Sequence, residues 1–501
     1  MSRSGFSPTS GSWVKPGGRK LWRGLALILV GYAVWYVSLG KGNVAPPLPQ
    51  SMSSTNRMCE MYPDTGDIAI SVKTGATEAM NKLPAILDTS LSCIQDVMVF
   101  SDLNQTYGNT KIHDVLSRFS PMAMKQNKDF DLYRAQLELQ SNGMEDEIED
   151  LVRMPAHVNH WATAGHNAPW ALDKYKFIHM LEMAYELQPG RAWYLFIEPD
   201  TYLSWPNLKR WIKTLNPTQK LFFGNAIQKS DDREPLYFAH GGSGFLISSV
   251  ALKEFAVDHK GTASSLDSRM HEYWAGDFTV ADTFYDNMGL KVTNAAPMLG
   301  REDSRSYAFG EGRWCQPVIT LHHMQAEDFK EISAIERTSE YSQLLLRDVY
   351  QKVFPDGLPS QKADWDNVAD AKEFALNANA RVTVKNGNSV DVVDPHSNLE
   401  SCRIACEHNE KCFQFTWRNT TIDEFGTPWG WSYKHSCVLS SAFRLGSAKP
   451  AQEFWANLQE KDTYRAWHSG WLNDRINTWV SQHRECPSGD HWTTDNSIVE
   501  A

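Results

Sequence analysis

The stretch that decides the fold is residues 193–202, with the sequence WYLFIEPDTY. Five consecutive apolar residues follow the turn residues Pro189 and Gly190, which is typical of a buried parallel strand. Two carboxylates, Glu198 and Asp200, come directly after the strand at the spacing i, i+2. In open α/β sheets the ligand crevice lies at this end of the strands, and hard carboxylate oxygens suit Mn²⁺ or Mg²⁺ bound to a diphosphate. The competing interpretation is an ordinary polar turn, because Asp and Pro commonly end strands.

Strands and helices alternate around this stretch. Residues 67–73 (DIAISVK) and 96–100 (DVMVF) have the pattern of strands, and residues 77–89 between them have helical apolar spacing. A helical pattern over residues 170–187 leads into the strand of the acid loop, and residues 221–224 (LFFG) predict a further strand. The alternation predicts an α/β fold that opens with a βαβ unit.

The N-terminal segment predicts a membrane anchor. Residues 21–40 (LWRGLALILVGYAVWYVSLG) are long enough, at 1.5 Å per residue, to cross a hydrocarbon core of about 30 Å. Four basic residues and no acidic one precede it, so the positive-inside rule places residues 1–20 in the cytosol. A cleaved signal peptide is the alternative, but no A-x-A-like site follows closely. We therefore expect a type II protein of the Golgi or ER membrane, with residues 41–58 as a Pro/Ser-rich stem and a lumenal catalytic domain.

Composition and cysteine usage fit a lumenal protein. The chain has eight cysteines, an even number that is typical of an oxidising compartment, although the spacing does not fix their pairing. Four of them cluster at residues 402–437, where a zinc site is the alternative, but the gaps lack paired C-x-x-C knuckles. A net charge of −11 and the lack of a basic stripe with interleaved aromatic residues argue against nucleic acid as a partner.

Two further motifs follow the acid loop. The loop FAHGGSGFLIS contains Gly241, Gly242 and Gly244, and glycines allow a backbone to approach a ligand closely. A tight turn is the alternative. Asp277 stands at the start of a helical pattern, where a carboxylate acts either as the N-terminal cap of the helix or as a general base.

The run VITLHHM, residues 318–324, ends a strand-like pattern in the paired histidines His322 and His323. Imidazole is a common metal ligand, although a histidine at the end of a strand is more often structural.

In this order and approximate spacing the motifs resemble glycosyltransferase family 31, in its Fringe and core 1 β1,3-galactosyltransferase branch, over residues 67–324. The resemblance implies a GT-A-like domain over residues 59–330, with a mixed, mainly parallel sheet flanked by helices. Asp200 matches the last acid of the family's acidic triplet, a divalent-metal ligand, and Glu198 replaces the first. Pro199 departs from the usual middle acid, which leaves the metal role of Glu198 less supported than that of Asp200.

The resemblance also assigns the remaining motifs. Gly241, Gly242 and Gly244 match a Gly-Gly-x-Gly-aromatic loop, and His322 aligns best with the metal-binding histidine, with His323 as the alternative. Asp277 matches the second acid of the family's acidic pair, which acts as the base, and Gly276 stands in place of the first. Asp102 matches the Ser-Asp that follows the second strand and belongs to the nucleotide pocket.

The function that the resemblance implies is metal-dependent sugar transfer with inversion. A hexosyl residue, galactose or N-acetylglucosamine, would move from a UDP-sugar, with Mn²⁺ or Mg²⁺ on the diphosphate, to a glycan or glycoprotein acceptor in a β1,3 linkage. Because Pro199 and Gly276 replace two acids, the alternative is a catalytically inactive, membrane-tethered carbohydrate-binding or chaperone protein on the same scaffold. A glycosidase is disfavoured, because nothing selects a pair of opposed carboxylates.

The C-terminal third predicts a separate unit. Residues 331–380 are expected to form a helical connection, and residues 491–501 a tail. Residues 381–490, with Cys402, Cys406, Cys412 and Cys437, resemble a PAN/Apple-like module. Such modules bind protein or carbohydrate, so the unit either captures the acceptor or acts as a disulfide-bonded cap that stabilises the catalytic domain.

Overall fold

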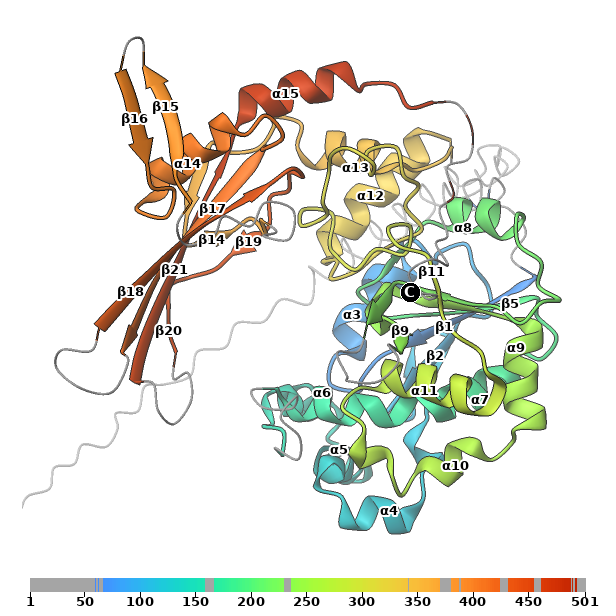
Figure 1. Cartoon of the computed structure of the whole chain (residues 1–501). Coiled ribbons are helices and arrows are strands. Elements are labelled where there is room, and N and C mark those ends of the chain that lie inside the picture. The colour runs from blue at the N-terminus through green and yellow to red at the C-terminus, as the bar shows by residue number, and fades with distance from the viewer. Residues whose placement is uncertain are drawn as a thin grey trace, which may run out of the picture. The chain divides into compact units, whose positions relative to one another are not determined.

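The computed structural model describes residues 59, 62, 66–157, 166–228, 236–340, 342–369, 380–386, 389–423, 431–454, 461–487, 489 and 492 (Figure 1). The predicted cytosolic tail, the anchor at residues 21–40 and the stem at residues 41–58 lie outside these residues. Within the described part of the chain, no helix has both the length and the apolar character needed to cross a membrane. Every helix and strand below lies in residues 61–501, which form one compact unit.

A central eight-stranded sheet has the order β11-β7-β10-β5-β1-β2-β4-β3. Its middle is parallel, because β1 pairs in parallel with β5 and β2, and β2 with β4. The antiparallel pairs are β10 with β5 and β7, and β3 with β4, whereas β11 pairs in parallel with β7. This mixed, mainly parallel sheet confirms the predicted GT-A-like α/β class. The strands are β1 (Ile68–Lys73), β2 (Met98–Ser101), β3 (Gln105–Tyr107), β4 (Thr110–Asp114), β5 (Trp193–Ile197), β7 (Phe222–Gly224), β10 (Phe245–Ser248) and β11 (Thr293–Asn294).

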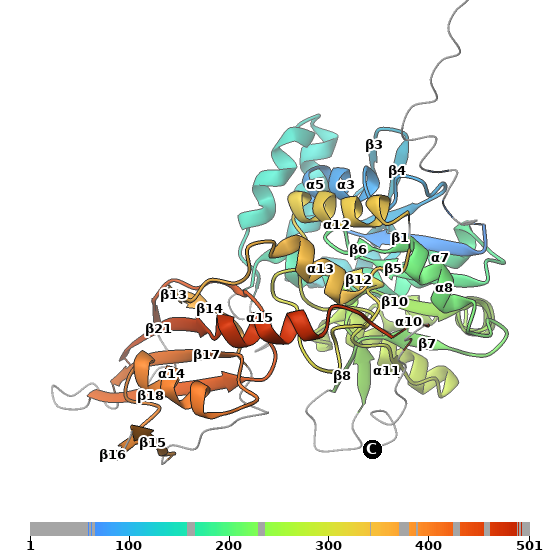
Figure 2. The same cartoon turned by 90° about the horizontal axis from the view of Figure 1, so that it is seen from above.

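Helices cover both faces of this sheet (Figures 1 and 2). Successive side chains of a strand point to opposite faces of the sheet, so β5 contributes side chains to two apolar cores. Trp193, Leu195 and Ile197 pack in one apolar cluster with α3, α8, α12 and α13, and Tyr194 and Phe196 pack in another with α7, α9 and α11. The helices are α3 (Ala79–Leu87), α7 (Phe177–Leu187), α8 (Trp205–Ile212), α9 (Ser249–Lys253), α11 (Gly276–Met288), α12 (Ala326–Thr338) and α13 (Leu346–Val353).

The prediction of one continuous helix over residues 170–187 was wrong. The chain forms α6 (Ala168–Asp173), a 3-10 turn over Lys174–Lys176, and then α7. The tighter turn directs Lys176 inward, where its ammonium donates to the carbonyl of Thr74 at 2.7 Å and lies 2.8 Å from Asp173. Apolar periodicity did not contain this signal, because the ion pair of Lys176 joins charged side chains.

The C-terminal region builds an antiparallel sheet in the order β13-β21-β17-β18, with β20 also paired to β21. The helix α14 (Leu399–His408) joins this sheet through an apolar cluster that contains Cys402, Phe415 and Leu439. A separate hairpin pairs β15 (Val382–Asn386) with β16 (Ser389–Val393), and α15 (Asn473–Gln482) follows β21. The strands are β13 (Gln361–Ala363), β17 (Gln414–Asp423), β18 (Trp431–Ser440), β20 (Gln452–Phe454) and β21 (Lys461–Trp471).

All eight cysteines are in disulfides, which confirms the expected oxidised set and excludes zinc at the cysteine cluster. Cys402 pairs with Cys437 and Cys406 with Cys412 inside the C-terminal region. Cys315 pairs with Cys486 across a sequence separation of 171 residues. The module bounds of 381–490 stay a prediction, although β13 already joins the C-terminal sheet at residues 361–363.

Candidate active site

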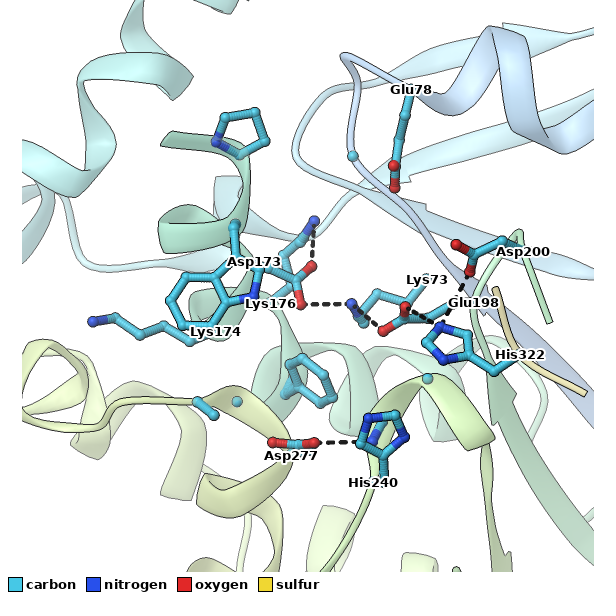
Figure 3. Close-up of a pocket in the computed structure, with 18 of the residues that line it drawn as sticks. Lys73, Glu78, Asp173, Lys174, Lys176, Glu198, Asp200, His240, Asp277 and His322 are labelled. Carbon is cyan, nitrogen blue, oxygen red and sulfur yellow. Dashed lines mark hydrogen bonds and ion pairs between the residues drawn. The ribbon is translucent and has the colours of Figure 1, made fainter. Parts of the chain in front are cut away.

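A cavity of about 580 Å³ opens at the C-terminal ends of β1 and β5 (Figure 3). Its lining comes from the turn after β1, the α6–α7 turn, the acid loop, the glycine loop, the start of α11 and the histidines that follow β12 (Thr320–Leu321). Seven of the nine predicted site residues line it. The other two, Asp102 and Gly244, lie outside the lining and contact elements next to it. The seven are Glu198, Asp200, Gly241, Gly242, Asp277, His322 and His323.

Glu198 lies between two cationic groups. Its Oε1 is 3.0 Å from Lys73 Nζ, and its Oε2 is 3.5 Å from His322 Nε2. Burial alone would raise the pKa of Glu198, but the Lys73 charge and the His322 contact outweigh it and hold that pKa well below its usual range. Both carboxylate oxygens of Glu198 therefore already face a protein partner.

Asp200 lies with the two histidines in the one described group of side chains that could hold a metal ion. Asp200, His322 and His323 each offer a ligand atom, and these atoms lie within 4.8 Å of one another. The buried Oδ1 of Asp200 has no hydrogen-bond partner, and its 3.4 Å approach to His322 Nε2 is an ion-pair contact. One carboxylate and two imidazoles are ligands that divalent transition-metal ions accept, so these residues fit a divalent cation.

A backbone turn at His323 brings the histidines together. His323 has a φ of +58°, in the left-handed region that residues other than glycine seldom adopt. Consecutive side chains of an extended strand would point to opposite faces, but here the two ring centroids are 3.8 Å apart. Burial lowers the pKa of His322, whereas contacts with Asp200 and Glu198 raise it by more, to about 9. The two carboxylates thus favour positive charge beside them, which Lys82 also supplies at 3.1 Å from Asp200 Oδ2.

The glycine loop packs directly on the metal-site histidine. A Cβ on Gly242 would lie 2.1 Å from His322 Cε1, so only glycine fits there. Gly244 has a φ of +79°, and its Cβ would lie 2.8 Å from Ile197 on β5. Gly242 and Gly244 therefore allow the backbone of the loop to approach His322 and Ile197 closely, and the role of the loop in binding a ligand stays a prediction.

Asp277 is positioned by the same loop. Its Oδ2 accepts a hydrogen bond from the Gly241 amide at 2.9 Å, and its Oδ1 accepts one from the Phe278 amide at 2.8 Å. The N-cap of α11 is Ala275, so Asp277 lies inside the first turn and is not the cap residue. Burial raises the pKa of Asp277 to about 6, and its two amide donors only partly oppose this rise.

Gly276, which stands where the family has an acid, contacts an aromatic ring. A Cβ at this position would lie 2.1 Å from Phe177 Cδ2. Phe177 is 3% exposed, and the Lys73 ammonium lies 4.6 Å from its ring centroid. The ring thus occupies the space that a side chain at position 276 would need.

Asp102 supports the turn after β1 from behind. It is 1% exposed, and its Oδ1 accepts a hydrogen bond from the Ala76 amide at 2.7 Å. Its Oδ2 lies 3.7 Å from Lys176 Nζ. Asp102 therefore fixes the turn whose Gly75 and Thr77 line the cavity.

Sequence reasoning missed a buried ion-pair chain along the cavity. Lys73 lies 2.6 Å from Asp173 as well as 3.0 Å from Glu198, and Asp173 in turn lies 2.8 Å from Lys176 (Figure 3). The available signal was Lys73 itself, a charged residue at the end of the apolar run of β1. Burial lowers the pKa of Lys73, but the charges of Asp173 and Glu198 outweigh it and raise the pKa overall.

Two apolar walls of the cavity were also missed. The first contains Ile227, Phe238 and Trp274, with the rings of Phe238 and Trp274 at 5.7 Å in an edge-to-face arrangement. The second contains Val152 and Trp170, joined by Asn167, which accepts from the Trp170 amide and donates to the Val152 carbonyl. Neither wall contains a titratable side chain.

Trp170 differs from the tryptophans that build the cores of the protein. It is 37% exposed and is the one tryptophan among the exposed large apolar side chains of the described residues. Its ring stacks on His166 with centroids 3.9 Å apart. An indole held in this way at a cavity edge presents a flat apolar face to a ligand.

Comparison with protein families gives a match to one part of the chain. Residues 64–300 match the family model described as Fringe-like, and this segment contains the acid loop, the glycine loop and Asp277. No protein among the curated proteins matches the chain. Residues 64–300 are therefore a Fringe-like segment, which supports the predicted resemblance to glycosyltransferase family 31 for this part of the protein.

Proposed function

We propose that the protein is an inverting, metal-dependent glycosyltransferase. It transfers a hexosyl residue, galactose or N-acetylglucosamine, from a UDP-sugar to a hydroxyl of a glycan or glycoprotein acceptor and forms a β1,3 linkage. One observation supports this most: a single cavity of the Fringe-like fold holds both the half-buried carboxylate of Asp277 and the carboxylate–imidazole cluster of Asp200, His322 and His323.

Asp200, His322 and His323 are the proposed metal ligands. A divalent cation bound there, manganese or magnesium, supplies charge neutralisation to the diphosphate of the donor. Glu198 orients His322 through the 3.5 Å contact, because Lys73 already occupies its other oxygen. Lys73 and Asp173 in turn fix Glu198 against the floor of the cavity.

Asp277 is the proposed general base. It accepts the proton of the acceptor hydroxyl while that oxygen attacks the anomeric carbon from the face opposite the diphosphate, which inverts the configuration. A pKa of about 6 keeps Asp277 ionised at neutral pH and makes it a stronger base than an exposed aspartate. The Gly241 and Phe278 amides hold its two oxygens, so the carboxylate needs no second acid at position 276 for its orientation.

The two apolar walls support a sugar ring as the acceptor group. Indole faces stack on the apolar face of a pyranose, and Trp170 and Trp274 present such faces to the cavity. The walls themselves contain no charged side chain, although Lys174 lines the same cavity. Trp274 lies three residues before Asp277, so an acceptor bound on it lies close to the base.

The membrane anchor and the C-terminal module belong to the same proposal. Residues 21–40 anchor the chain as a type II protein of the Golgi or ER membrane, and the disulfide set supports a catalytic domain on the oxidising, lumenal side. The C-terminal region is proposed to be PAN/Apple-like, on the basis of its helix α14 cross-linked to an antiparallel sheet.

A second candidate function is supported by Pro199 and Gly276. Both residues stand where the family pattern has an acid, and the Phe177 ring fills the space that a side chain at position 276 would need. A chain without these two acids fits a carbohydrate-binding or chaperone protein that binds the donor but does not transfer the sugar.

The experiment that separates the two candidates is UDP release by the full chain in detergent. A panel of UDP-sugars and neutral or acidic glycan acceptors is tested with manganese and with chelator. Manganese-dependent release that rises with one acceptor supports the transferase and identifies both substrates. Manganese-dependent UDP binding without release under any donor–acceptor pair supports the binding protein.

A further inference from the structure

The histidine half of the proposed metal cluster lies outside the family match. The Fringe-like match ends at residue 300, whereas His322 and His323 come 22 and 23 residues later. The chain reaches them through the segment 301–316, which has few regular elements of its own. Its position must therefore come from contacts with other parts of the protein.

Backbone hydrogen bonds join this segment to the C-terminal region. The amide of Phe309 donates to the carbonyl of Phe443 at 3.0 Å, and the amide of Phe443 donates back at 2.8 Å. The amide of Leu445 donates to the carbonyl of Arg305 at 2.9 Å. Three bonds of this kind fix the register between the two stretches.

Buried aromatic side chains reinforce this pairing. Phe309 and Phe443 are fully buried, with ring centroids 6.2 Å apart. Trp314 packs edge-to-face on Trp479 of α15 at 5.3 Å, and its indole N–H donates to the carbonyl of His483 at 2.7 Å. The segment and the C-terminal residues therefore share one apolar core.

A disulfide closes the far end of the segment. Cys315 is bonded to Cys486, which lies beyond α15 near the end of the chain. Cys315 comes only seven residues before His322, so the cross-link restricts the chain just ahead of the proposed ligands.

The segment in turn holds the histidines. The amide of His322 donates to the carbonyl of Glu302 at 3.1 Å, and the amide of Gly300 donates to the carbonyl of Thr320 at 3.0 Å. At the other end, the amide of Leu346 donates to the carbonyl of Gln316 at 3.0 Å. Movement of the segment would therefore move the backbone of His322.

We propose that the C-terminal residues Phe443, Trp479, His483 and Cys486 form a positioning element for the metal site. They hold the 301–316 segment and thereby keep His322 and His323 against Asp200. The inference rests on the proposed metal role of the two histidines. It gives the C-terminal region a function at the catalytic centre in addition to any binding of its own.

The test is manganese affinity of the full chain without nucleotide, measured from the electron paramagnetic resonance signal of free Mn²⁺. The double substitution Cys315→Ser with Cys486→Ser is compared with Cys402→Ser with Cys437→Ser, which removes a disulfide between α14 and β18 inside the C-terminal region. Loss of a group that orients metal ligands typically weakens metal affinity by about 10- to 100-fold. We expect about tenfold weaker binding for the first pair and a change of less than about twofold for the control.

Thermal unfolding separates positioning from general stabilisation. If the C-terminal region only stabilises the fold, the Cys315/Cys486 variant melts earlier but binds manganese with unaltered affinity at a temperature where it remains folded, which overturns the inference. If that variant does not fold, manganese affinity is measured for Trp314→Phe, which keeps the disulfide and a packed ring but removes the hydrogen bond to His483. Unchanged manganese affinity in this variant again overturns the inference. Failure of the unaltered chain to bind manganese would instead overturn the metal role itself, and the inference with it.

Discussion

Substituting Gly242 with alanine adds one methyl group directly against the proposed metal ligand His322. The new Cβ would lie 2.1 Å from Cε1 and 2.3 Å from Nε2 of that ring, whereas ordinary contact begins near 3.4 Å. The ring or the loop must therefore shift by about 1.3 Å, the difference between 3.4 and 2.1 Å. A shift of this size moves a ligand atom out of coordinating distance, because metal–nitrogen bonds tolerate only about 0.2 Å.

The loop cannot take up the shift easily. The Thr201 hydroxyl donates to the Gly242 carbonyl at 2.7 Å, and the Thr320 hydroxyl donates to the Ser243 carbonyl at 2.7 Å. Both anchors come from the segments that supply the metal ligands, so the imidazole ring is the part that yields. We expect Gly242→Ala to weaken manganese binding by about 10- to 100-fold, or about 1.4 to 2.7 kcal/mol.

The assay is direct manganese titration of the full chain, repeated as manganese dependence of UDP binding. Gly241→Ala is the matched control, because its Cβ would lie 3.3 Å from Phe177 Cζ and requires only a small adjustment. Wild-type manganese affinity in a folded Gly242→Ala variant would refute the reasoning, since it would mean that the His322 ring is not a ligand.

Four other predictions concern carboxylates. Asp277→Asn should reduce transfer by about 10²- to 10⁴-fold while UDP binding persists, and near-normal turnover would remove Asp277 from the role of base. In the unaltered enzyme kcat/KM should fall as pH drops below about 6, because the protonated carboxyl cannot accept a proton; a pH limb near 4 would contradict the effect of burial. Asp200→Ala should abolish manganese-dependent UDP binding, and an unchanged manganese titration would count against it. Glu336 is buried on α12 and accepts hydrogen bonds from the hydroxyls of Tyr202 and Ser204. Burial raises the pKa of Glu336 from 4.5 to about 7. The contribution of Glu336 to the free energy of unfolding is therefore complete below pH 4.5 and is lost as pH rises through 7. The loss is about 3 kcal/mol at 1.36 kcal/mol per pKa unit, so urea unfolding should show that stability falls less between pH 5 and 8 in Glu336→Gln than in the unaltered chain, by roughly 2 to 3 kcal/mol. An equal fall in both proteins would assign the pH dependence to other groups.

The sheet and most of the cavity lining were predictable because they depend on local patterns. The apolar run of β5 bounded by Pro189 and Gly190 marked a buried strand, and the position of Asp200 after it followed from the topology of α/β sheets. The glycine loop was predictable for the same reason, since only glycine allows a close approach of backbone to another group. In each case a few neighbouring residues contained the whole signal.

The features of the site that could not be predicted depend on contacts between residues far apart in the sequence. Nothing near Gly276 in the sequence indicates that the Phe177 ring, about a hundred residues earlier, fills the adjacent space. Likewise, the Lys73–Asp173 pair joins residues 100 positions apart. The 3-10 turn at Lys174–Lys176 holds Lys176 in such an ion pair with Asp173, which apolar periodicity does not indicate.

The bond between Cys315 and Cys486 has a consequence for the synthesis of the protein. A ribosome that has just completed His322 must add more than 160 further residues before Cys486 exists, which takes roughly 10 to 30 s at about 5 to 20 residues per second. During that interval the nascent chain contains Asp200 and Asp277 but lacks the partner that is proposed to secure His322 and His323. A chain that terminates early would therefore have the acid loop and the base without a secured metal site, so catalytic competence would be acquired only when translation is almost finished.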